Sequence, residues 1–378
     1  MKIFFLTRSY LPTIAGGTLI RKAQVDSFER AGFEVIVVVP NYNQKRISIQ
    51  ENIIRIPLSY NLRVAHWLER IGIYEDYLDK WVKRAFKYLK DKIKKDDILF
   101  ATSGGELGNI KLASSLKEQV GCKFVVNFHD PLDYSLVNGF LLDNAFHISR
   151  ERQERKYLRN ADLIITSANS HRLSLENKLP FLKDKIKNTF FGYVERVEPK
   201  EKKISDKLRI VYGGTFSSVQ SPELLSKVAQ NMEGIEIYFV GNYQEYKPII
   251  PFLRLENSHF IPFLPHDEFL NFMMEKIDVG FVSLASNSLG DGIPSKVYEY
   301  INLGLPILGA LPTVEHLINQ KGYGIVCQYN DLNCLKEAIE TLKNKKEYQK
   351  FQDNILKDKN FWAMEERIKE VVLWLKNL

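Results

Sequence analysis

The stretch KIFFLTRSY at residues 2–10 begins the pattern that decides the fold. Its apolar run is typical of a buried strand. A helix-length segment follows from Gly17 to Arg30, and FEVIVVVP at 33–40 is the next buried strand. Two buried strands joined by a helix form a βαβ unit, so the sequence predicts an α/β protein built on parallel sheets.

The alternation of strands and helices continues along the chain and restarts in its second half. Further strands are expected at 97–103, 123–129, 162–168, 207–214, 235–241, 259–264, 278–284 and 306–310. Between the two sets lies VERVEPKEKKISDK at 194–207, a charged segment with a proline that is typical of a linker. A chain of 378 residues also exceeds the usual size of a single core. We therefore expect two domains, 1–195 and 196–361, with a ligand cleft between them at the carboxyl ends of the strands.

Composition narrows the class of protein. The longest apolar runs, such as EVIVVVP at 34–40, are far shorter than the roughly 20 residues that span a bilayer. The N-terminus lacks the apolar region and cleavage site of a signal peptide, so we expect a cytoplasmic protein. Cys122, Cys327 and Cys334 form no CxxC pair, which argues against a zinc site, a haem site or a disulfide framework. We expect three buried thiols.

The positive charge is concentrated in the first half of the chain. Residues 1–195 carry 31 basic and 22 acidic side chains, a net charge of +9, whereas 196–378 carry 22 and 24, a net charge of −2. A basic field favours anionic partners, which include nucleic acid, acidic phospholipid and phosphate-bearing substrates. Charge alone does not choose among them.

A helix with clear start and stop signals is expected to begin within DGIPSKVYEY at residues 291–300. Pro294 suits the first helical turn and Gly304 suits the residue that ends the helix. Free amides at the helix start, next to Gly292, would suit a diphosphate. Glu299, a turn and a half further on, would suit the hydroxyls of a ribose. The alternative is an ordinary capped helix with a solvent-facing glutamate.

These residues resemble those of the GT-B-fold glycosyltransferases, in particular retaining glycosyltransferase family 4. The resemblance rests on Asp291 and Glu299, eight positions apart, and on the segment YEYINLGLPILG at 298–309. It implies two Rossmann-like domains facing across a cleft, with a final helix at 362–378 that crosses back to the first domain. It also implies that Glu299 binds the ribose and Asp291 the donor sugar, although an aspartate is unusual at the first position.

A second segment, VYGGTFSSVQSPELL at 211–225, resembles the phosphate-binding loop of that family. Typical members carry an arginine and a lysine where this chain has Thr215 and Gln220. Stabilisation of the leaving diphosphate then falls to other groups of this chain. They are Lys296, the amides of Ser295, Gly214 and Thr215, and the hydroxyls of Ser217 and Ser218. The alternative for Lys296 is a solvated lysine on a helix face.

The first half contributes candidates as well. His129 ends the strand VVNFHDP at 125–131, where the resemblance places a residue facing the donor sugar and the acceptor. Gly16 and Gly17 would let the backbone approach a phosphate or sugar. The dinucleotide fingerprint GxGxxG is missing after the first strand, so a nicotinamide dehydrogenase is not expected.

The predicted reaction is transfer of a hexosyl or N-acetylhexosaminyl group from a nucleoside diphosphate sugar, UDP-linked, to a hydroxyl of a saccharide. The resemblance implies retention by a front-face mechanism, polysaccharide or glycan assembly on a lipid-linked acceptor, and no metal ion or other cofactor. Two alternatives stay open. One is a GT-B-fold epimerase or hydrolase of sugar nucleotides, and the other is a non-catalytic binding protein, which Thr215 and Gln220 would favour.

A basic and aromatic region covers residues 61–95, and its first part, 61–81, contributes Trp67, Ile71 and Tyr74. Its second part, KWVKRAFKYLKDKIKK at 80–95, sets apolar residues at helical spacing among lysines; they are Trp81, Ala85, Phe86, Leu89 and Ile93. We expect peripheral contact with an anionic membrane, at the inner face of the cell membrane. The alternative is a helix packed on the sheet with a solvated outer face. No nucleic-acid-binding motif accompanies the charge.

Overall fold

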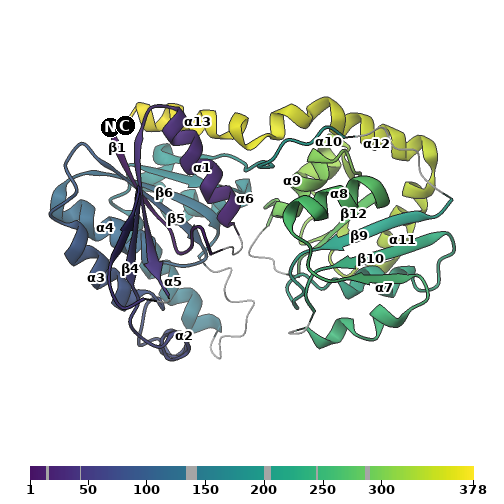
Figure 1. Ribbon diagram of the computed structural model, residues 1–378, viewed down its shortest axis with the longest axis horizontal. Helices are drawn as coiled ribbons and strands as arrows, with labels where there is room; N and C mark the ends of the chain where they lie inside the picture. Colours follow the sequence, from purple (N-terminus) through teal and green to yellow (C-terminus); the bar gives the residue numbers. More distant parts are fainter. Residues whose placement is uncertain (14–16, 43, 133–142, 200–205, 244–245, 286–289) are drawn as a thin grey trace. The chain divides into compact units, whose positions relative to one another are not determined.

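The computed structural model describes residues 1–13, 17–42, 44–132, 143–199, 206–243, 246–285 and 290–378, with the backbone alone for 143–148. The chain divides into two compact units (Figure 1). The first comprises Met1–Phe190 and Arg367–Leu378, and the second comprises Phe191–Glu366. The sequence predicts a domain boundary between residues 195 and 196 and a closing helix at 362–378. In the structure the first unit ends at Phe190, and it resumes at Arg367, so that residues 362–366 belong to the second unit.

The first unit is built on an eight-stranded sheet in the order β3-β4-β2-β1-β5-β6-β7-β8, parallel except for β3. Its strands are β1 Lys2–Leu6, β2 Glu34–Asn41, β3 Ser48–Gln50, β4 Ile53–Pro57, β5 Ile98–Gly104, β6 Lys123–Asp130, β7 Leu163–Thr166 and β8 Ile186–Asn188. Its helices are α1 Thr18–Arg30, α2 Leu62–Arg70, α3 Asp79–Leu89, α4 Gly108–Val120, α5 Asp143–Leu158 and α6 Asn169–Lys178, with the short 3-10 helix Pro180–Lys185. Most of α13, Met364–Lys376, also belongs to this unit.

The second unit is built on a parallel six-stranded sheet in the order β11-β10-β9-β12-β13-β14. Its strands are β9 Leu208–Gly213, β10 Ile235–Val240, β11 Ser258–Ile261, β12 Val279–Ser283, β13 Ile307–Leu311 and β14 Gly324–Gln328. Its α-helices are α7 Glu223–Ala229, α8 His266–Lys276, α9 Ser295–Asn302, α10 Leu317–Lys321, α11 Leu332–Lys343 and α12 Lys345–Asp358. Short 3-10 helices cover Lys247–Ile249, Phe252–Arg254 and Lys359–Trp362.

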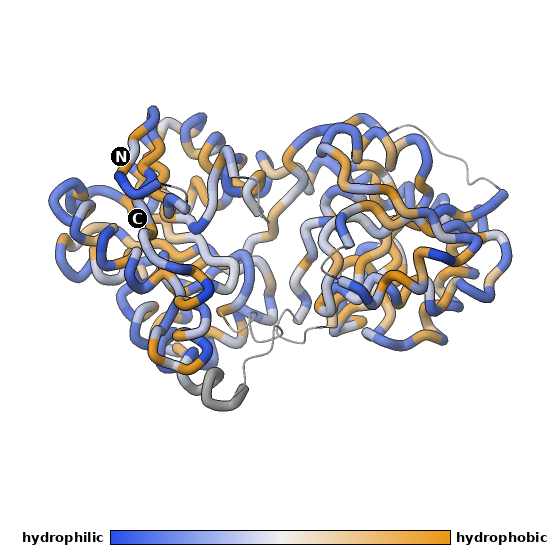
Figure 2. Tube along the Cα trace, turned by 60° about the horizontal axis from the view of Figure 1, so that its bottom comes forward, coloured by the Kyte–Doolittle hydropathy of each residue, from blue (hydrophilic) through white to orange (hydrophobic). Residues whose placement is uncertain are grey.

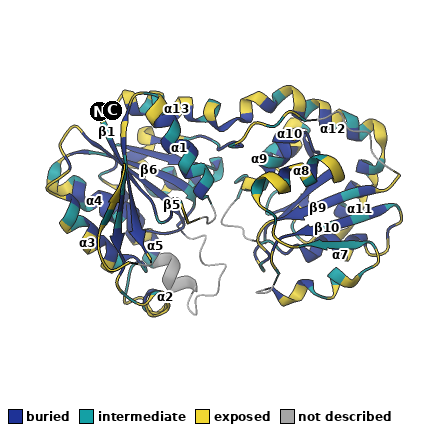
Figure 3. Ribbon diagram, in the orientation of Figure 1, coloured by how far each residue is buried: buried dark blue, intermediate teal, exposed yellow. Residues whose placement is uncertain are grey.

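The predicted α/β class and the two parallel sheets are confirmed. Central strands such as β5 and β12 are buried along their whole length, which is why they are continuous apolar runs in the sequence (Figure 3). The hydropathy of the chain follows the same layering (Figure 2). The edge strands β3, β8 and β14 were not predicted, and neither was the internal strand β4. Two of them, β3 and β8, are only three residues long and carry exposed polar side chains, so they give no apolar signal.

The expectation for residues 80–95 needs two corrections. Helix α3 ends at Leu89, so it is shorter than predicted. Its apolar stripe lies in the core: Trp81 and Leu89 are fully buried, and the Trp81 indole donates a hydrogen bond to the Ile56 carbonyl at 3.1 Å. The stripe therefore packs on the sheet, and the outer face of the helix presents lysines.

The expectation for the cysteines is also wrong in part. Cys327, at the end of β14, and Cys334, in the first turn of α11, form a disulfide. Their separation of seven residues gave no motif, but the turn between strand and helix brings them together. Cys122 is a buried free thiol, as predicted. Among the described helices, none combines the length and the apolarity that a bilayer-spanning segment needs.

Candidate functional site

Helix α9 presents its first turn at the carboxyl edge of the second sheet. Pro294 is the N-cap in an extended conformation, so the helix begins one residue later than predicted. The carbonyl of Pro294 accepts from the Val297 amide at 2.9 Å. The first amides of any helix, here those of Ser295 and Lys296, have no acceptor inside it. Ser295 is exposed, so this turn offers donors to an anion.

Lys296 lies over an aromatic ring beside a glycine. Its ammonium Nζ is 3.7 Å from the centroid of the Tyr212 ring. A Cβ on Gly214 would lie 3.1 Å from the Lys296 Cε, so the side chain occupies the space that this glycine leaves. No carboxylate of the described residues forms an ion pair with it. Burial without a counter-charge lowers the pKa of Lys296 to about 7.

Glu299 lies one turn after Lys296, and residues three apart share one face of a helix. The next residue, Tyr300, packs inward against Gly280, and its hydroxyl donates to the Phe281 carbonyl at 3.2 Å. The Glu299 Oε2 atom is buried and has no hydrogen-bond partner among the described residues. Burial raises the pKa of Glu299 to about 6, against the opposing effect of nearby His266. A buried oxygen without a donor is an unsatisfied acceptor that a ligand hydroxyl would satisfy.

In the loop after β9, several of the groups predicted to bind phosphate are already hydrogen-bonded within the protein. Gly214 adopts a φ of 116° that favours glycine, but its amide donates to the Val240 carbonyl at 2.9 Å, so this amide is not available to a phosphate. The Ser217 hydroxyl donates to the Gln220 side-chain oxygen, so these two predicted ligands are paired with each other. Thr215 and Ser218 are exposed. Of the predicted loop groups, they are the two that remain open to a ligand.

His316 is a residue of this site that the sequence did not reveal. It is fully buried, and its Nδ1 accepts from the Ile318 amide at 3.3 Å, which leaves Nε2 as the donor to the Gly292 carbonyl at 3.3 Å. Burial lowers the pKa of His316, so the ring is neutral at pH 7. It thereby holds the backbone between Asp291 and Pro294. The one clue to a structural role is that His316 directly precedes helix α10, as its N-cap.

The first unit gathers a second set of polar residues at the carboxyl edge of its sheet. Gly17 is the N-cap of α1 with a φ of 77°, and a Cβ there would lie 3.4 Å from a guanidinium nitrogen of Arg21. Gly16 lies outside the described residues. Arg21 is fully buried and donates to the Ser9 hydroxyl at 2.9 Å. Neither Arg21 nor Arg8, which lies two residues after the end of β1, was predicted as a site residue.

Strand β6 brings His129 and Asp130 into this set. A Cβ on Gly104 would lie 3.4 to 3.5 Å from Arg8, Arg21 and Asp130, so these three side chains converge there. Arg8 pairs with Glu106 at 3.3 Å. Burial raises the pKa of Asp130 to about 6. Burial, together with the two arginines, lowers the pKa of His129 well below its usual range, so the imidazole is neutral at pH 7.

Each set has a definite chemical capacity. The second unit offers free helix amides, one cation and one unsatisfied carboxylate oxygen, which matches a group that carries both phosphate and hydroxyls. The first unit offers a neutral imidazole and a carboxylate whose pKa lies near neutrality, and both groups can accept a hydrogen bond from a hydroxyl. His129, Lys296 and Glu299 were predicted; Arg8, Arg21, Asp130 and His316 were not.

Comparison with known proteins gives a fold and no family. No protein-family model matches the chain, and no curated protein sequence matches it. Solved structures do resemble it over 100% of its length. They include Anabaena Alr3699/HepE in complex with UDP-glucose, with a TM-score of 0.70, 12% identity and 100% of that chain covered. The UDP-forming alpha,alpha-trehalose-phosphate synthase of Burkholderia vietnamiensis gives 0.70, 10% and 100%. The lipopolysaccharide outer core galactosyltransferase WaaB in its apo form gives 0.66, 12% and 100%.

At this level of identity, likeness shows shared architecture, and function must be argued from the site. The likeness covers both sheets and the whole length of each matched chain. The chain therefore has the GT-B fold.

Proposed function

We propose that the protein is a glycosyltransferase that moves a sugar from a UDP-linked donor to a hydroxyl of a saccharide, with retention at the anomeric carbon. The observation that carries the proposal is one face of α9, where a cation without an ion pair and a buried carboxylate oxygen without a donor follow a helix start. The solved structures described above support it, because one holds UDP-glucose, one is described as a galactosyltransferase and one as a UDP-forming synthase.

Donor binding is proposed for the second unit. Glu299 accepts hydrogen bonds from the ribose, and Asp291 contacts the sugar. The amide of Ser295 and the ammonium group of Lys296 stabilise the charge that develops on the leaving diphosphate, and preorganised electrostatics of this kind is usually the largest catalytic term. Lys296 then takes the place of the arginine and lysine that typical relatives carry where this chain has Thr215 and Gln220.

Acceptor binding is proposed for the first unit. His129 is neutral, so it accepts a hydrogen bond from a sugar hydroxyl without repelling the donor's positive anomeric centre. In a front-face reaction the leaving phosphate oxygen takes the acceptor proton, and the protein contributes by orienting both substrates and excluding water. The acceptor we propose is a lipid-linked saccharide in polysaccharide or glycan assembly.

The first test is donor binding measured by thermal shift. UDP-glucose, UDP-galactose and UDP-N-acetylglucosamine are each expected to raise the Tm, because a ligand that binds only the folded state stabilises it. Glu299→Gln is expected to remove the shift while leaving the Tm of the free protein nearly unchanged. The control is Glu337→Gln on the exposed side of α11, which should shift like the wild type. A Tm unchanged by every UDP, GDP and ADP sugar would contradict the proposal.

Product analysis separates the proposed reaction from its alternatives. A transferase leaves the donor intact until an acceptor is added. Turnover of the donor without acceptor, to free sugar or to an epimeric sugar nucleotide, would identify a hydrolase or epimerase. Binding with no product would identify a non-catalytic protein.

The dependence of kcat/KM on pH is expected to be bell-shaped, with its maximum between pH 6 and 7. Glu299, with a pKa raised to about 6, loses its charge as the pH falls below that value, which weakens ribose binding. Lys296, with a pKa lowered to about 7, loses its charge as the pH rises above that value, which weakens phosphate binding. Glu299→Gln should remove the acidic limb and Lys296→Met the basic limb. Flat kcat/KM between pH 5.5 and 8 would refute both roles.

A further inference from the structure

Helix α2 of the first unit carries apolar residues on both its inner and its outer side. A helix on a folded domain normally buries its apolar face and shows its polar face to water. In α2 the inner side carries the buried Ala65, Leu62, which packs against the core, and Glu69, which pairs with Arg150 at 2.8 Å. The exposed side carries Val64 and Trp67, whose exposed fractions are 51% and 58%. These exposed apolar side chains are not needed to hold the helix on its own unit.

The exposed apolar residues form one stripe. Val64, Trp67 and Ile71 lie at positions i, i+3 and i+7 of the helix and its end, which places them on one face. Ile73, 64% exposed, lies just beyond the end of the helix. None of these four residues belongs to the core cluster of the unit. Figure 3 shows α2 as a largely exposed element at the edge of the unit. We call these four residues the α2 stripe.

The α2 stripe is held in place by polar contacts on the other side of the helix. The Asn61 side chain caps the helix by accepting from the Arg63 amide at 2.9 Å. The His66 ring stacks on the Tyr77 ring with 4.3 Å between centroids. The Glu69–Arg150 pair ties α2 to α5. The stripe is thus preorganised on a fixed helix, which lowers the entropy lost on docking.

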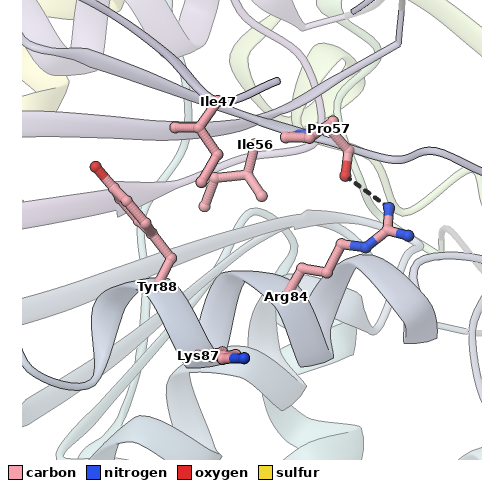
Figure 4. A pocket seen from close by; sticks show the side chains of 6 residues that line it. All are labelled: Ile47, Ile56, Pro57, Arg84, Lys87 and Tyr88. Atoms are coloured by element: carbon pink, nitrogen blue, oxygen red, sulfur yellow. Dashed lines mark hydrogen bonds between the residues drawn. The ribbon is translucent and has the colours of Figure 1, made fainter. Parts of the chain in front are cut away.

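Cations border the stripe and continue onto α3. Arg63 and Arg70 are exposed on α2, and the segment 61–95 carries 10 basic and 5 acidic residues. Lys80 lies 6.0 Å from the centroid of the Tyr60 ring, just before α2. Along α3 the exposed Arg84 and Lys87 line a cavity of about 370 Å³ (Figure 4).

That cavity also combines apolar side chains with cations. Its other lining residues are Ile47, Ile56, Pro57 and Tyr88. Figure 4 shows the Arg84 guanidinium bonded to the Pro57 carbonyl at 3.2 Å, at the edge of this apolar floor. Ile47 is itself 42% exposed. Apolar side chains and cations therefore occur together on α3 as well as on α2.

We propose that the α2 stripe docks on an anionic lipid bilayer. Trp67 lies at the headgroup level, Val64, Ile71 and Ile73 enter the interface, and Arg63, Arg70 and the exposed cations of α3 contact lipid phosphates. Tryptophan beside arginine and lysine is the combination that anchors proteins at this interface, and a cationic border complements acidic headgroups. The inference assigns the membrane contact expected for residues 61–95 to α2, because the apolar stripe of α3 is buried. It does not depend on the proposed sugar transfer.

The test is cosedimentation of the full chain with phosphatidylcholine vesicles, with and without phosphatidylglycerol, in the absence of any sugar nucleotide. Binding is expected only with phosphatidylglycerol and should weaken with salt. The double variant Trp67→Ser/Ile71→Ser should lower the vesicle affinity roughly tenfold or more. Arg63→Gln and Arg70→Gln should each lower it about fivefold. Phe181→Ser, at a residue 62% exposed elsewhere in this unit, is the matched control and should bind like the wild type.

Tryptophan fluorescence gives a second readout. The emission of the wild type should shift to the blue when anionic vesicles are added, and Trp67→Phe should abolish the shift while retaining binding. The proposal is overturned if vesicles with and without phosphatidylglycerol bind equally, if neither binds, or if the double variant binds like the wild type. A dimer in solution that the double variant dissolves would also overturn it, because the stripe would then serve a second copy of the chain. Thermal shift with UDP sugars, measured without vesicles, tests the proposed function separately.

Discussion

Replacement of Lys296 by methionine is expected to lower kcat for sugar transfer by roughly 100- to 1000-fold. Methionine keeps the length and apolar character of the side chain over the Tyr212 ring, so packing is preserved and the charge is lost. Within the described part of the chain, no salt bridge neutralises Lys296, so its charge is available to the leaving diphosphate. Steady-state kinetics with the best UDP sugar from the binding screen would measure the effect.

Two further variants test whether the charge itself is responsible. Lys336→Met on the exposed side of α11 removes the same charge from the same unit and should leave kcat unchanged. Lys296→Arg keeps the charge but places a larger group against Gly214, so partial activity is expected. If Lys296→Met retained wild-type kcat, the proposed role of the ammonium group would be wrong, even if donor binding persisted.

Substitution of Gly241 by alanine is expected to lower the free energy of unfolding by about 3 kcal/mol. Gly241 follows β10 with a φ of 150°, in the range that favours glycine, and an added Cβ would lie 2.3 Å from the Gly214 carbonyl oxygen. Relief of that overlap must move the loop that carries Gly214. Loss of the donor-induced Tm shift is therefore expected together with the loss of stability. Urea unfolding and the thermal-shift assay measure the two effects.

Gly234→Ala is the matched control for this prediction. Gly234 has a φ of 71°, but the nearest atom to an added Cβ is 3.8 Å away, on the Lys343 side chain. Backbone strain alone then applies, and a loss of about 1 kcal/mol is expected, with donor binding intact. Equal losses for the two variants would show that the close approach of Gly241 to Gly214 has no energetic consequence.

The parallel sheets could be predicted because their strands are buried on both faces and so read as continuous apolar runs. The start of α9 could be predicted from Pro294 and Gly304, because these two residue types restrict where a helix begins and ends. The lowered pKa of Lys296 could not be predicted. It results from burial, and the residues that cover Lys296 include Tyr212 on β9 and Gly214 in the loop after β9, far from Lys296 in the sequence. The convergence of Arg8, Arg21 and Asp130 on Gly104 likewise depends on the order of strands in the sheet.

Helices α2 and α3 show why periodicity alone is insufficient. Both carry apolar residues at helical spacing, so the two patterns look alike in the sequence. In α3 the stripe that includes Trp81 faces the sheet, whereas in α2 the stripe that includes Trp67 faces solvent. Helix α2 also packs Leu62 and Ala65 on its inner side, so it has apolar residues on two faces and only one of them can be buried. A sequence pattern shows which residues share one face of a helix, but it does not show whether that face lies against the sheet or in solvent.

The return of the chain to its first unit has a consequence for biosynthesis. Residues Arg367–Leu378 complete that unit: Ile368, Val371 and Leu375 are buried there, and Glu370 accepts a hydrogen bond from Thr189 at 3.3 Å. Domains generally fold as they leave the ribosome, with the N-terminal one first. Here the N-terminal domain cannot finish folding until translation has passed through the whole of the second. During translation the first domain therefore remains incomplete, and the apolar surface that Ile368, Val371 and Leu375 later cover is exposed at the stage when chaperones most often bind.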